Sequence, residues 1–217
     1  MLELDFPGVS MKISEEAAII ASHTALSTIS SALVGGGFLQ THTIINYHVH
    51  KTYNHSDPAS DLLRFAAACQ IAEPFVGMMT AVFPRDTTTV TLRDTNLTVA
   101  CILTAGLRVA TAAGQSLPAP YLPGTINTIV LLDADLVPSA LVNAIITATE
   151  AKTGLLLERG IRTEEGYAAT GTMTDAVTIA CTGRGAPLPY AGPGTQVGYL
   201  IGVSVRQCLS QAVVTEG

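Results

Sequence analysis

Six stretches of the chain have the hydrophobic pattern of β-strands. Each combines β-branched residues with either an alternation of apolar and polar positions or an unbroken apolar run, and both patterns are typical of strands in a sheet. We therefore expect strands near Ile44–Val49, Val76–Val82, Thr88–Leu92, Leu97–Leu103, Asn127–Leu132 and Ala176–Cys181.

Four other stretches have apolar residues at helical spacing. In the clearest of them the apolar positions recur every three or four residues from Leu141 to Leu156. Pro138, a residue favoured in the first turn of a helix, precedes this stripe, and Gly160 follows it where a helix is expected to stop. The predicted helices are Glu15–Ala21, Ala59–Gln70, Ser139–Glu158 and Gln196–Ala212.

Loops rich in glycine and proline separate these elements, at 35–37, 113–124 and 183–194. The two long loops lack the polar composition of a linker and lead directly into apolar segments, so we interpret them as loops of one domain and as candidates for lining a site. Strands and helices mix without strict βαβ alternation. The sequence therefore predicts an α+β fold, a layered mixed sheet with packed helices, in a single compact domain over residues 1–217.

The composition narrows the class of protein. Of the 217 residues, 48% are apolar and 13% are charged, which excludes a disordered chain. The net charge is -6 and the 11 Lys and Arg residues do not cluster, which argues against nucleic acid as a partner. We find no apolar run of the roughly 18–20 residues that a membrane span needs. The acidic amino end lacks the order of a signal peptide. We therefore expect a cytoplasmic protein with no membrane partner, and so apolar a chain is compatible with a homo-oligomer.

The spacings typical of metal sites are missing. The cysteines are far apart, form no CxxC pair and lie in apolar surroundings, which predicts buried free thiols at Cys69, Cys101, Cys181 and Cys208. A strand through the histidine-rich segment would carry, on one face, His42, Asn46, His48 and His50. That face is open to three interpretations: a metal site, the wall of a polar pocket, or plain surface. A histidine there could also serve as a general base near neutral pH.

Two segments combine hydroxyl, amide and carboxylate groups close to glycine. In one, Thr125 and Asn127 follow Gly124 and point to the same face of a strand. A threonine hydroxyl can act as a nucleophile and an asparagine amide can donate to a developing oxyanion. The alternative is a polar strand edge. In the other segment, Gly171, Thr172, Thr174 and Asp175 precede a strand, and the carboxylate could orient a base or a substrate amide. There the alternative is an ordinary turn.

Two further features are weaker on their own. Glu150 and Lys152 are two positions apart on a predicted helix, so they cannot pair with each other, and in so apolar a stripe at least one of them could face inward. The alternative is a solvated helix face. The three glycines Gly35–Gly37 either cradle an anion or turn a corner, and no Lys-Ser/Thr pair follows them as in a nucleotide-binding loop.

Taken in order, several segments resemble the adenosylcobinamide amidohydrolase family. They are SSALVGGG (30–37), INYHVHKTYNHSDP (45–58), VGMMTAV (76–82), LTAGL (103–107), GTINTIVLLDADL (124–136), TATEAKTGLL (147–156), TGTMTDAVTIAC (170–181) and YAGPGTQVGYLIG (190–202). The resemblance implies an enzyme of corrinoid salvage in cobalamin biosynthesis. Such an enzyme hydrolyses the amide between the aminopropanol arm and the corrin ring, giving adenosylcobyric acid. After LTAGL the chain departs from the expected pattern with Arg108, which could meet a propionamide or a carboxylate of the corrinoid.

A fainter likeness extends to aminopeptidases and acyltransferases that use an N-terminal Ser or Thr nucleophile, in which Thr125 would occupy the nucleophile position. Such enzymes cut themselves before the nucleophile, whereas this chain is continuous. Either Thr125 works through its hydroxyl with a side-chain base, or the scaffold is shared and water is the nucleophile.

These features combine in one working hypothesis. The scissile carbonyl lies near Thr125, Asn127 polarises it, Asp175 with Thr172 orients the leaving amine or a water, and Glu150 or His48 carries the proton. The corrinoid, with no metal or cofactor, contacts Gly35, Gly36, Gly37, Asn46, Thr80, Thr104, Arg108, Gly171, Thr174, Gly192, Gly194 and Thr195. The rival interpretations are a corrinoid-binding module without catalysis and a hydrolase of another amide.

Overall fold

A mixed β-sheet forms the centre of the protein. The computed structural model describes residues 4–120 and 123–215, and within these ranges eight strands make one sheet in the order β4-β3-β2-β11-β8-β6-β5, with β1 beside β2. The pairs β3–β4 and β8–β11 are parallel and the others are antiparallel. The bounds are β1 Val9–Ile13, β2 Ala17–Ser30, β3 Gly37–His48, β4 Val76–Thr80, β5 Thr88–Asp94, β6 Leu97–Ala105, β8 Ile126–Leu132 and β11 Ala176–Cys181.

Three long helices cover the sheet in the described part of the chain: α1 Pro58–Ala68, α2 Pro138–Glu158 and α3 Gln196–Thr215. Short elements complete the connections, namely the 3₁₀ turns η1 Pro84–Asp86 and η2 Leu107–Val109 and the two-residue strands β7 Ala110–Thr111, β9 Asp135–Leu136, β10 Gly171–Thr172 and β12 Pro187–Leu188. The predicted α+β class with a mixed sheet and packed helices is therefore confirmed.

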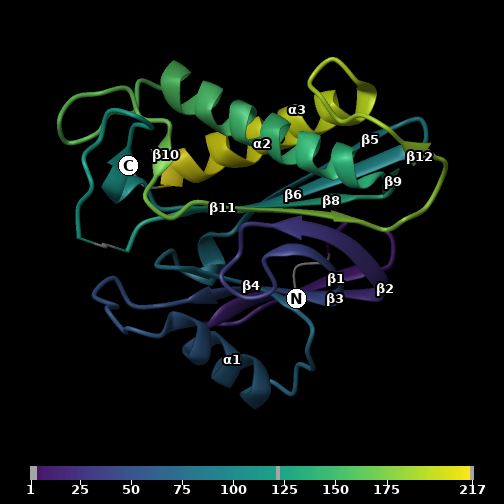
Figure 1. The fold of residues 1–217 in the computed structure, drawn as a ribbon, viewed down its shortest axis with the longest axis horizontal. Helices are drawn as coiled ribbons and strands as arrows, with labels where there is room; N and C mark the ends of the chain where they lie inside the picture. The colour runs from purple at the N-terminus through teal and green to yellow at the C-terminus, as the bar shows by residue number, and fades with distance from the viewer. Residues whose placement is uncertain (1–3, 121–122, 216–217) are drawn as a thin grey trace.

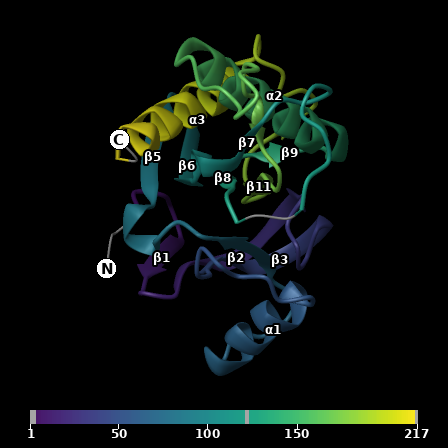
Figure 2. The same cartoon turned by 90° about the vertical axis from the view of Figure 1, so that its left-hand side faces the viewer.

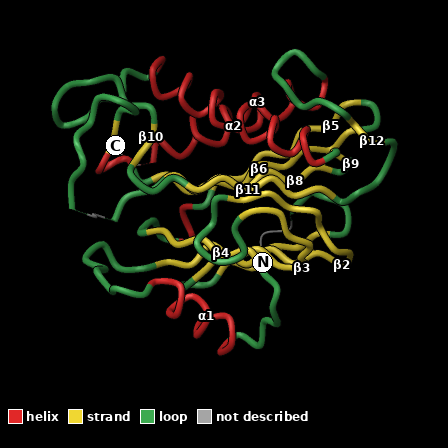
Figure 3. The backbone as a smooth tube through the Cα atoms, in the orientation of Figure 1, coloured by secondary structure: helices red, strands yellow, loops and turns green. Residues whose placement is uncertain are grey.

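The elements stack in four layers. Figure 1 shows α2 and α3 above the half of the sheet that contains β11, β8 and β6, and α1 beneath the half that contains β2, β3 and β4. The view turned by 90° has the same order (Figure 2), and the strands lie between the two sets of helices (Figure 3). The sheet is thus bent over, so that its two halves face each other.

Strand alternation divides the core among these layers. In β8, Ile126, Val130 and Leu132 pack toward α2 and α3, whereas Ile129 and Leu131 pack into the layer between the two sheet halves. The same inner layer receives apolar residues from both halves, including Ile20, Leu26, Ile44, Met78 and Ile102. A third cluster joins the outer face of β3 to α1. Burial of these faces is the main stabilising contribution that brings the halves together.

Most of the expected elements lie where the sequence placed them. All six predicted strands are present, and three of the four predicted helices are present within two or three residues at each end. The fourth, Glu15–Ala21, is wrong: this segment contains the start of the long strand β2. A short apolar run such as Ala17–Ile20 fits a buried strand as well as a helix, and pairing with β1 and β3 decides between them.

One smaller expectation also needs correction. Cys101, Cys181 and Cys208 are buried as predicted, and burial raises the pKa of the Cys181 thiol to about 12, but Cys69 is exposed just after α1. Among the described helices α2 is long and apolar enough to cross a membrane by length and composition alone, and 44% of the 18-residue window that meets this criterion is buried inside the structure.

The inner layer gives a first test of this architecture. We expect Ile129→Ala to lower the free energy of unfolding by about 2–5 kcal/mol. The smaller side chain leaves a cavity between the two sheet halves, and the hydrogen-bonded strands cannot move enough to fill it. The measurement is denaturant unfolding followed by circular dichroism. The matched control is Ile146→Ala on the outer face of α2, where 48% of the residue is exposed and a change within about 0.5 kcal/mol is expected. Equal effects of the two substitutions would contradict the layered arrangement.

Candidate active site

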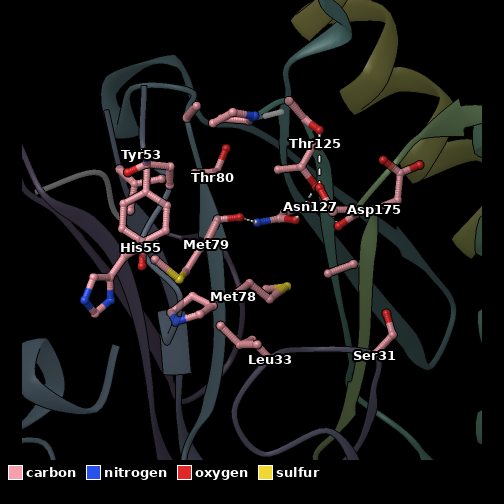
Figure 4. Close-up of a pocket in the computed structure, with 18 residues that line it drawn as sticks. Ser31, Leu33, Tyr53, His55, Met78, Met79, Thr80, Thr125, Asn127 and Asp175 are labelled. Atoms are coloured by element: carbon pink, nitrogen blue, oxygen red, sulfur yellow. Dashed lines mark hydrogen bonds between the residues drawn. The ribbon is translucent and has the colours of Figure 1, made fainter. Parts of the chain in front are cut away.

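A cavity of about 550 Å³ opens at one end of the inner layer, where the apolar filling gives way to polar side chains. Its size is within the range of small-molecule sites. Figure 4 shows Thr125, Asn127 and Asp175 on one side of it and Met79 and Tyr53 on the other. Met78 and Leu33 supply apolar wall. The predicted residues Thr125, Asn127, Thr80, Thr174 and Asp175 therefore meet in one place.

Thr125 lies immediately before β8, and its hydroxyl has a fixed direction. The hydroxyl donates to the backbone carbonyl of Thr174 at 2.9 Å and has a second acceptor in Asn127 Oδ1 at 3.2 Å. Because the hydrogen is directed to these acceptors, the oxygen lone pairs are left for the cavity. In the described residues, no imidazole or carboxylate forms a hydrogen bond with this hydroxyl.

Asn127 joins the two halves of the sheet at the cavity. Its Nδ2 donates to the Met79 carbonyl of β4 at 2.8 Å and to Asn46 Oδ1 of β3 at 2.7 Å. Since a backbone carbonyl can only accept, the contact with Met79 fixes which way the amide points. Asn46 Nδ2 in turn donates to Thr104 Oγ1 at 3.0 Å. Asn46, Thr104 and Asn127 are all buried, so this network replaces their hydrogen bonds to water.

This network changes the role expected for Asn127. An asparagine amide has two hydrogens, and both are already donated, to Met79 and Asn46. Asn127 is therefore a group that holds the site in shape, and it is not free to polarise a substrate carbonyl in this arrangement. Asn46 and Thr104, expected to contact substrate, also belong to this support and do not line the cavity.

Asp175 is likewise engaged on both oxygens. Oδ1 accepts from the backbone N–H of Ile126 at 3.0 Å and of Thr172 at 3.2 Å, and also from the Thr172 hydroxyl. Oδ2 forms an ion pair with Lys152 of α2, whose side chain is buried. This ion pair explains why residue 171 is a glycine. A methyl group there would clash with Asp175 Oδ2 and would lie 2.7 Å from Lys152 Nζ.

The opposite wall comes from the segment between β3 and α1, which sequence reasoning did not assign to the site. Tyr53, Asn54 and His55 line the cavity. Tyr53 donates its hydroxyl to Asp61 of α1 at 2.6 Å, and this hydrogen bond, with His55 and Arg64 nearby, holds the pKa of Asp61 below its usual value. The aromatic and polar residues in INYHVHKTYNH are typical of a cavity wall. The segment is far from Thr125 along the chain, so the sequence alone did not indicate that the two face each other.

The proton carriers expected from the sequence lie elsewhere. Glu150 is exposed on the outer face of α2, and of the two charged residues considered there it is Lys152 that faces inward. His48 is at the end of β3, where its Nδ1 meets the Val82 carbonyl at 3.0 Å and its ring stacks near Phe83. Neither Glu150 nor His48 lines the cavity.

Several expected substrate contacts are also displaced. Gly35, Gly36 and Gly37 turn the chain between β2 and β3, and Gly35 packs against the Phe75 carbonyl, so that Ser31 and Leu33 line the cavity in their place. Gly192, Gly194 and Thr195 lie just before α3, and Gly192 packs against Asn143, near the end of α2 that is remote from Lys152. Arg108 lies in η2, on a separate hollow beside Lys51 and Asp86.

Of the expected loops, the one at 113–124 contributes Pro123 and Gly124 to the cavity, and its residues Tyr121 and Leu122 lie outside the described residues. The loop at 183–194 does not contribute to it. Across residues 4–120 and 123–215, no group of three or more His, Cys, Asp or Glu side chains is placed to hold a metal ion.

Comparison with known proteins places the whole arrangement in a family. Residues 7–217 match the family described as adenosylcobinamide amidohydrolase. The chain is also 34% identical over 193 residues to the adenosylcobinamide amidohydrolase of Methanosarcina mazei, covering 85% of this chain and 88% of that one. The chain belongs to the adenosylcobinamide amidohydrolase family. Membership confirms the predicted enzyme class at the level of the family, an amidohydrolase.

Two other relatives match over shorter segments. The adenosylcobinamide amidohydrolase of Halobacterium salinarum is 36% identical over 124 residues, which are 53% of this chain and 48% of that one. An uncharacterised protein of Methanocaldococcus jannaschii is 36% identical over 95 residues, 43% of this chain and 37% of that one. The chain thus spans less than half the length of these two relatives.

Two solved structures superimpose on the chain at low sequence identity. A protein from Pyrococcus horikoshii OT3 superimposes with a TM-score of 0.57 at 11% identity, covering 98% of this chain and 80% of that one. The L-aminopeptidase D-Ala-esterase/amidase of Ochrobactrum anthropi gives a TM-score of 0.45 at 13% identity, covering 95% of this chain and 83% of that one. The first similarity shows a common fold for this member of the amidohydrolase family, and the second carries no conclusion about its reaction.

The packing of Gly171 against the ion pair is directly testable. We expect Gly171→Ala to lower the free energy of unfolding by about 1–3 kcal/mol, because the added methyl group pushes Asp175 and Lys152 apart. Gly202→Ala in α3 is the matched control, since no atom lies within 4 Å of the added methyl group. In a helix interior this change is expected to stabilise by up to about 1 kcal/mol. Thermal unfolding of both variants decides, and a Gly171→Ala protein as stable as the unchanged one would refute the contact.

Proposed function

We propose that the protein hydrolyses the amide between the aminopropanol arm and the corrin ring of adenosylcobinamide, giving adenosylcobyric acid and aminopropanol for corrinoid salvage. Two observations support this. The chain belongs to the adenosylcobinamide amidohydrolase family. The cavity beside β8 also presents a hydroxyl, Thr125 Oγ1, whose hydrogen is donated to the Thr174 carbonyl.

The oriented Thr125 hydroxyl is the observation that carries the proposal. In the proposed reaction its oxygen attacks the amide carbonyl, and the bond to the aminopropanol nitrogen breaks as that nitrogen takes up a proton. Water then hydrolyses the resulting threonine ester, which releases adenosylcobyric acid and restores the hydroxyl. Among the described residues no side-chain base is bonded to it, so its proton leaves through water or through a group that the substrate brings into reach. Water in place of Thr125 is the competing nucleophile.

Polarisation of the substrate carbonyl falls to hydroxyl groups that still have a hydrogen to donate. Thr80 Oγ1 accepts from the Val82 N–H at 3.1 Å, and Ser31 Oγ accepts from the Val177 N–H at 3.0 Å. Within the described residues neither hydroxyl donates to a protein acceptor, and both side chains line the cavity. Thr80, expected from the sequence to contact substrate, is the proposed donor because it lines the cavity on the side of Met79, across from Thr125 (Figure 4).

The cavity volume indicates how a large corrinoid would bind. About 550 Å³ suits a ligand of drug size at most. An adenosylated corrin macrocycle is larger than that, so only the amide-bearing arm enters, and the ring rests at the mouth. The apolar lining of Met78, Met79 and Leu33 fits the methylene groups of such an arm.

The reaction is tested by incubating purified protein with adenosylcobinamide and following products by mass spectrometry. The expected products are adenosylcobyric acid and aminopropanol. Corrinoid that is bound but recovered intact would instead support a binding module, and activity on other amides alone would reassign the substrate. Parallel reactions with and without a chelator test whether a metal ion takes part.

Thr125 is tested by a pair of variants that each lose one hydroxyl and keep the shape of the side chain. We expect Thr125→Val to lower kcat by at least about 10³-fold, because the attacking oxygen is removed. Thr128→Val is the control, since Thr128 is buried in β8 toward the helices and its hydroxyl has no hydrogen-bond partner among the described residues. It should keep near-normal turnover. Near-normal turnover in a folded Thr125→Val protein would show that water is the nucleophile.

A further inference from the structure

A buried cation lies directly behind the proposed reacting group. Lys152 is 6% exposed and does not line the cavity, so it is not placed to touch a substrate. Among the described residues its hydrogen-bond partner is Asp175 Oδ2. Removing an ammonium group from water is unfavourable unless it is paired, and a nonpolar residue would fill the same space at less cost. The pair therefore calls for an explanation beyond stability.

Asp175 transmits the effect of Lys152 to the start of β8. Its other oxygen, Oδ1, accepts from the backbone N–H of Ile126 at 3.0 Å, and Ile126 is the residue after Thr125. A second bond runs the opposite way, from the Thr125 hydroxyl to the carbonyl of Thr174, the residue before Asp175. Segments 125–126 and 174–175 are thus joined by two hydrogen bonds. The ion pair of Asp175 with Lys152 lies next to them.

We propose that Lys152 is a positioning residue for the reaction: it fixes the Asp175 carboxylate, which holds the Ile126 amide and thereby the direction of the Thr125 hydroxyl. This inference rests on the proposed function of Thr125. It also gives Asp175 a role different from orienting a leaving amine, because both carboxylate oxygens are already occupied by protein donors. Without Lys152 the carboxylate would turn toward water and release the Ile126 N–H.

Hydrogen exchange of single backbone amides tests the positioning without any substrate. In Lys152→Met we expect the Ile126 amide to exchange at least about tenfold faster than in the unchanged protein, while the Ile129 amide in the middle of β8 stays protected. Lys12→Met, the same change at an exposed lysine of β1, is the matched control and should alter neither amide. Unchanged protection of Ile126 in Lys152→Met would overturn the proposal.

Turnover gives the second arm of the test. Lys152→Met should lower kcat by at least about tenfold, because the Thr125 hydroxyl loses its fixed direction. KM should stay within about twofold, because Lys152 does not line the cavity. A kcat within twofold of the unchanged protein, or a loss carried by KM, would overturn the positioning role. If the unchanged protein forms no product from adenosylcobinamide, the proposed function fails, and the exchange result still decides the inference.

A double variant covers the case in which Lys152→Met leaves a buried unpaired carboxylate and does not fold. Lys152→Met with Asp175→Asn removes both charges, and the Asn oxygen can still accept from the Ile126 N–H. If Lys152 acts through Asp175, the double variant matches Asp175→Asn alone in kcat and in Ile126 exchange. A double variant at least about tenfold slower than Asp175→Asn would show that Lys152 acts independently of Asp175, which would refute the proposal.

Discussion

The site depends on one buried amide. Asn127 donates to Met79 and Asn46 and is a second acceptor, at 3.2 Å, for the Thr125 hydroxyl, so a single side chain ties β8 to both β3 and β4 beside that hydroxyl. These strands belong to opposite halves of the bent sheet, and most of the layer between the halves is filled by apolar side chains. Apolar contacts hold layers together without fixing their register. The directional bonds of Asn127 set where the two halves meet, and hence the shape of the cavity between them.

Strand alternation explains why the groups around Thr125 come from two different layers. Thr125 and Asn127 point into the inner layer, and so face the cavity and β4. Val177 and Ile179 of β11 point the other way, toward α2, and Asp175 continues that direction to reach Lys152. Because β8 and β11 are parallel neighbours, the two sets lie one strand apart and are joined through the Ile126 amide. The layer of α2 and α3 can thus influence the cavity although none of the described side chains of these two helices lines it.

The sequence was a good guide wherever a property is local. The period of apolar residues located six strands and three helices, and the pair Thr125 and Asn127 was correctly placed on one face of one strand. It failed for the start of β2, because a four-residue apolar run has no period of its own and its partners β1 and β3 decide its conformation. Glycine-rich loops also misled, since Gly35 and Gly37 have the positive φ of a tight turn and Gly192 packs against the Asn143 side chain.

The sequence could not show which polar side chains already have hydrogen-bond partners within the protein. Asn127 and Asp175 have the residue types expected of an oxyanion donor and an orienting carboxylate. However, Asn127 donates to groups in β3 and β4, more than 30 residues away in sequence, and Asp175 is paired with Lys152 of α2. A buried polar group that has its partners gains little by leaving them for a substrate. Groups with unused hydrogens, Thr80 and Ser31, are therefore better placed to bind a substrate than those with the more suggestive chemistry. Specificity at such a site comes chiefly from the shape of the apolar wall and from a few remaining hydroxyl groups.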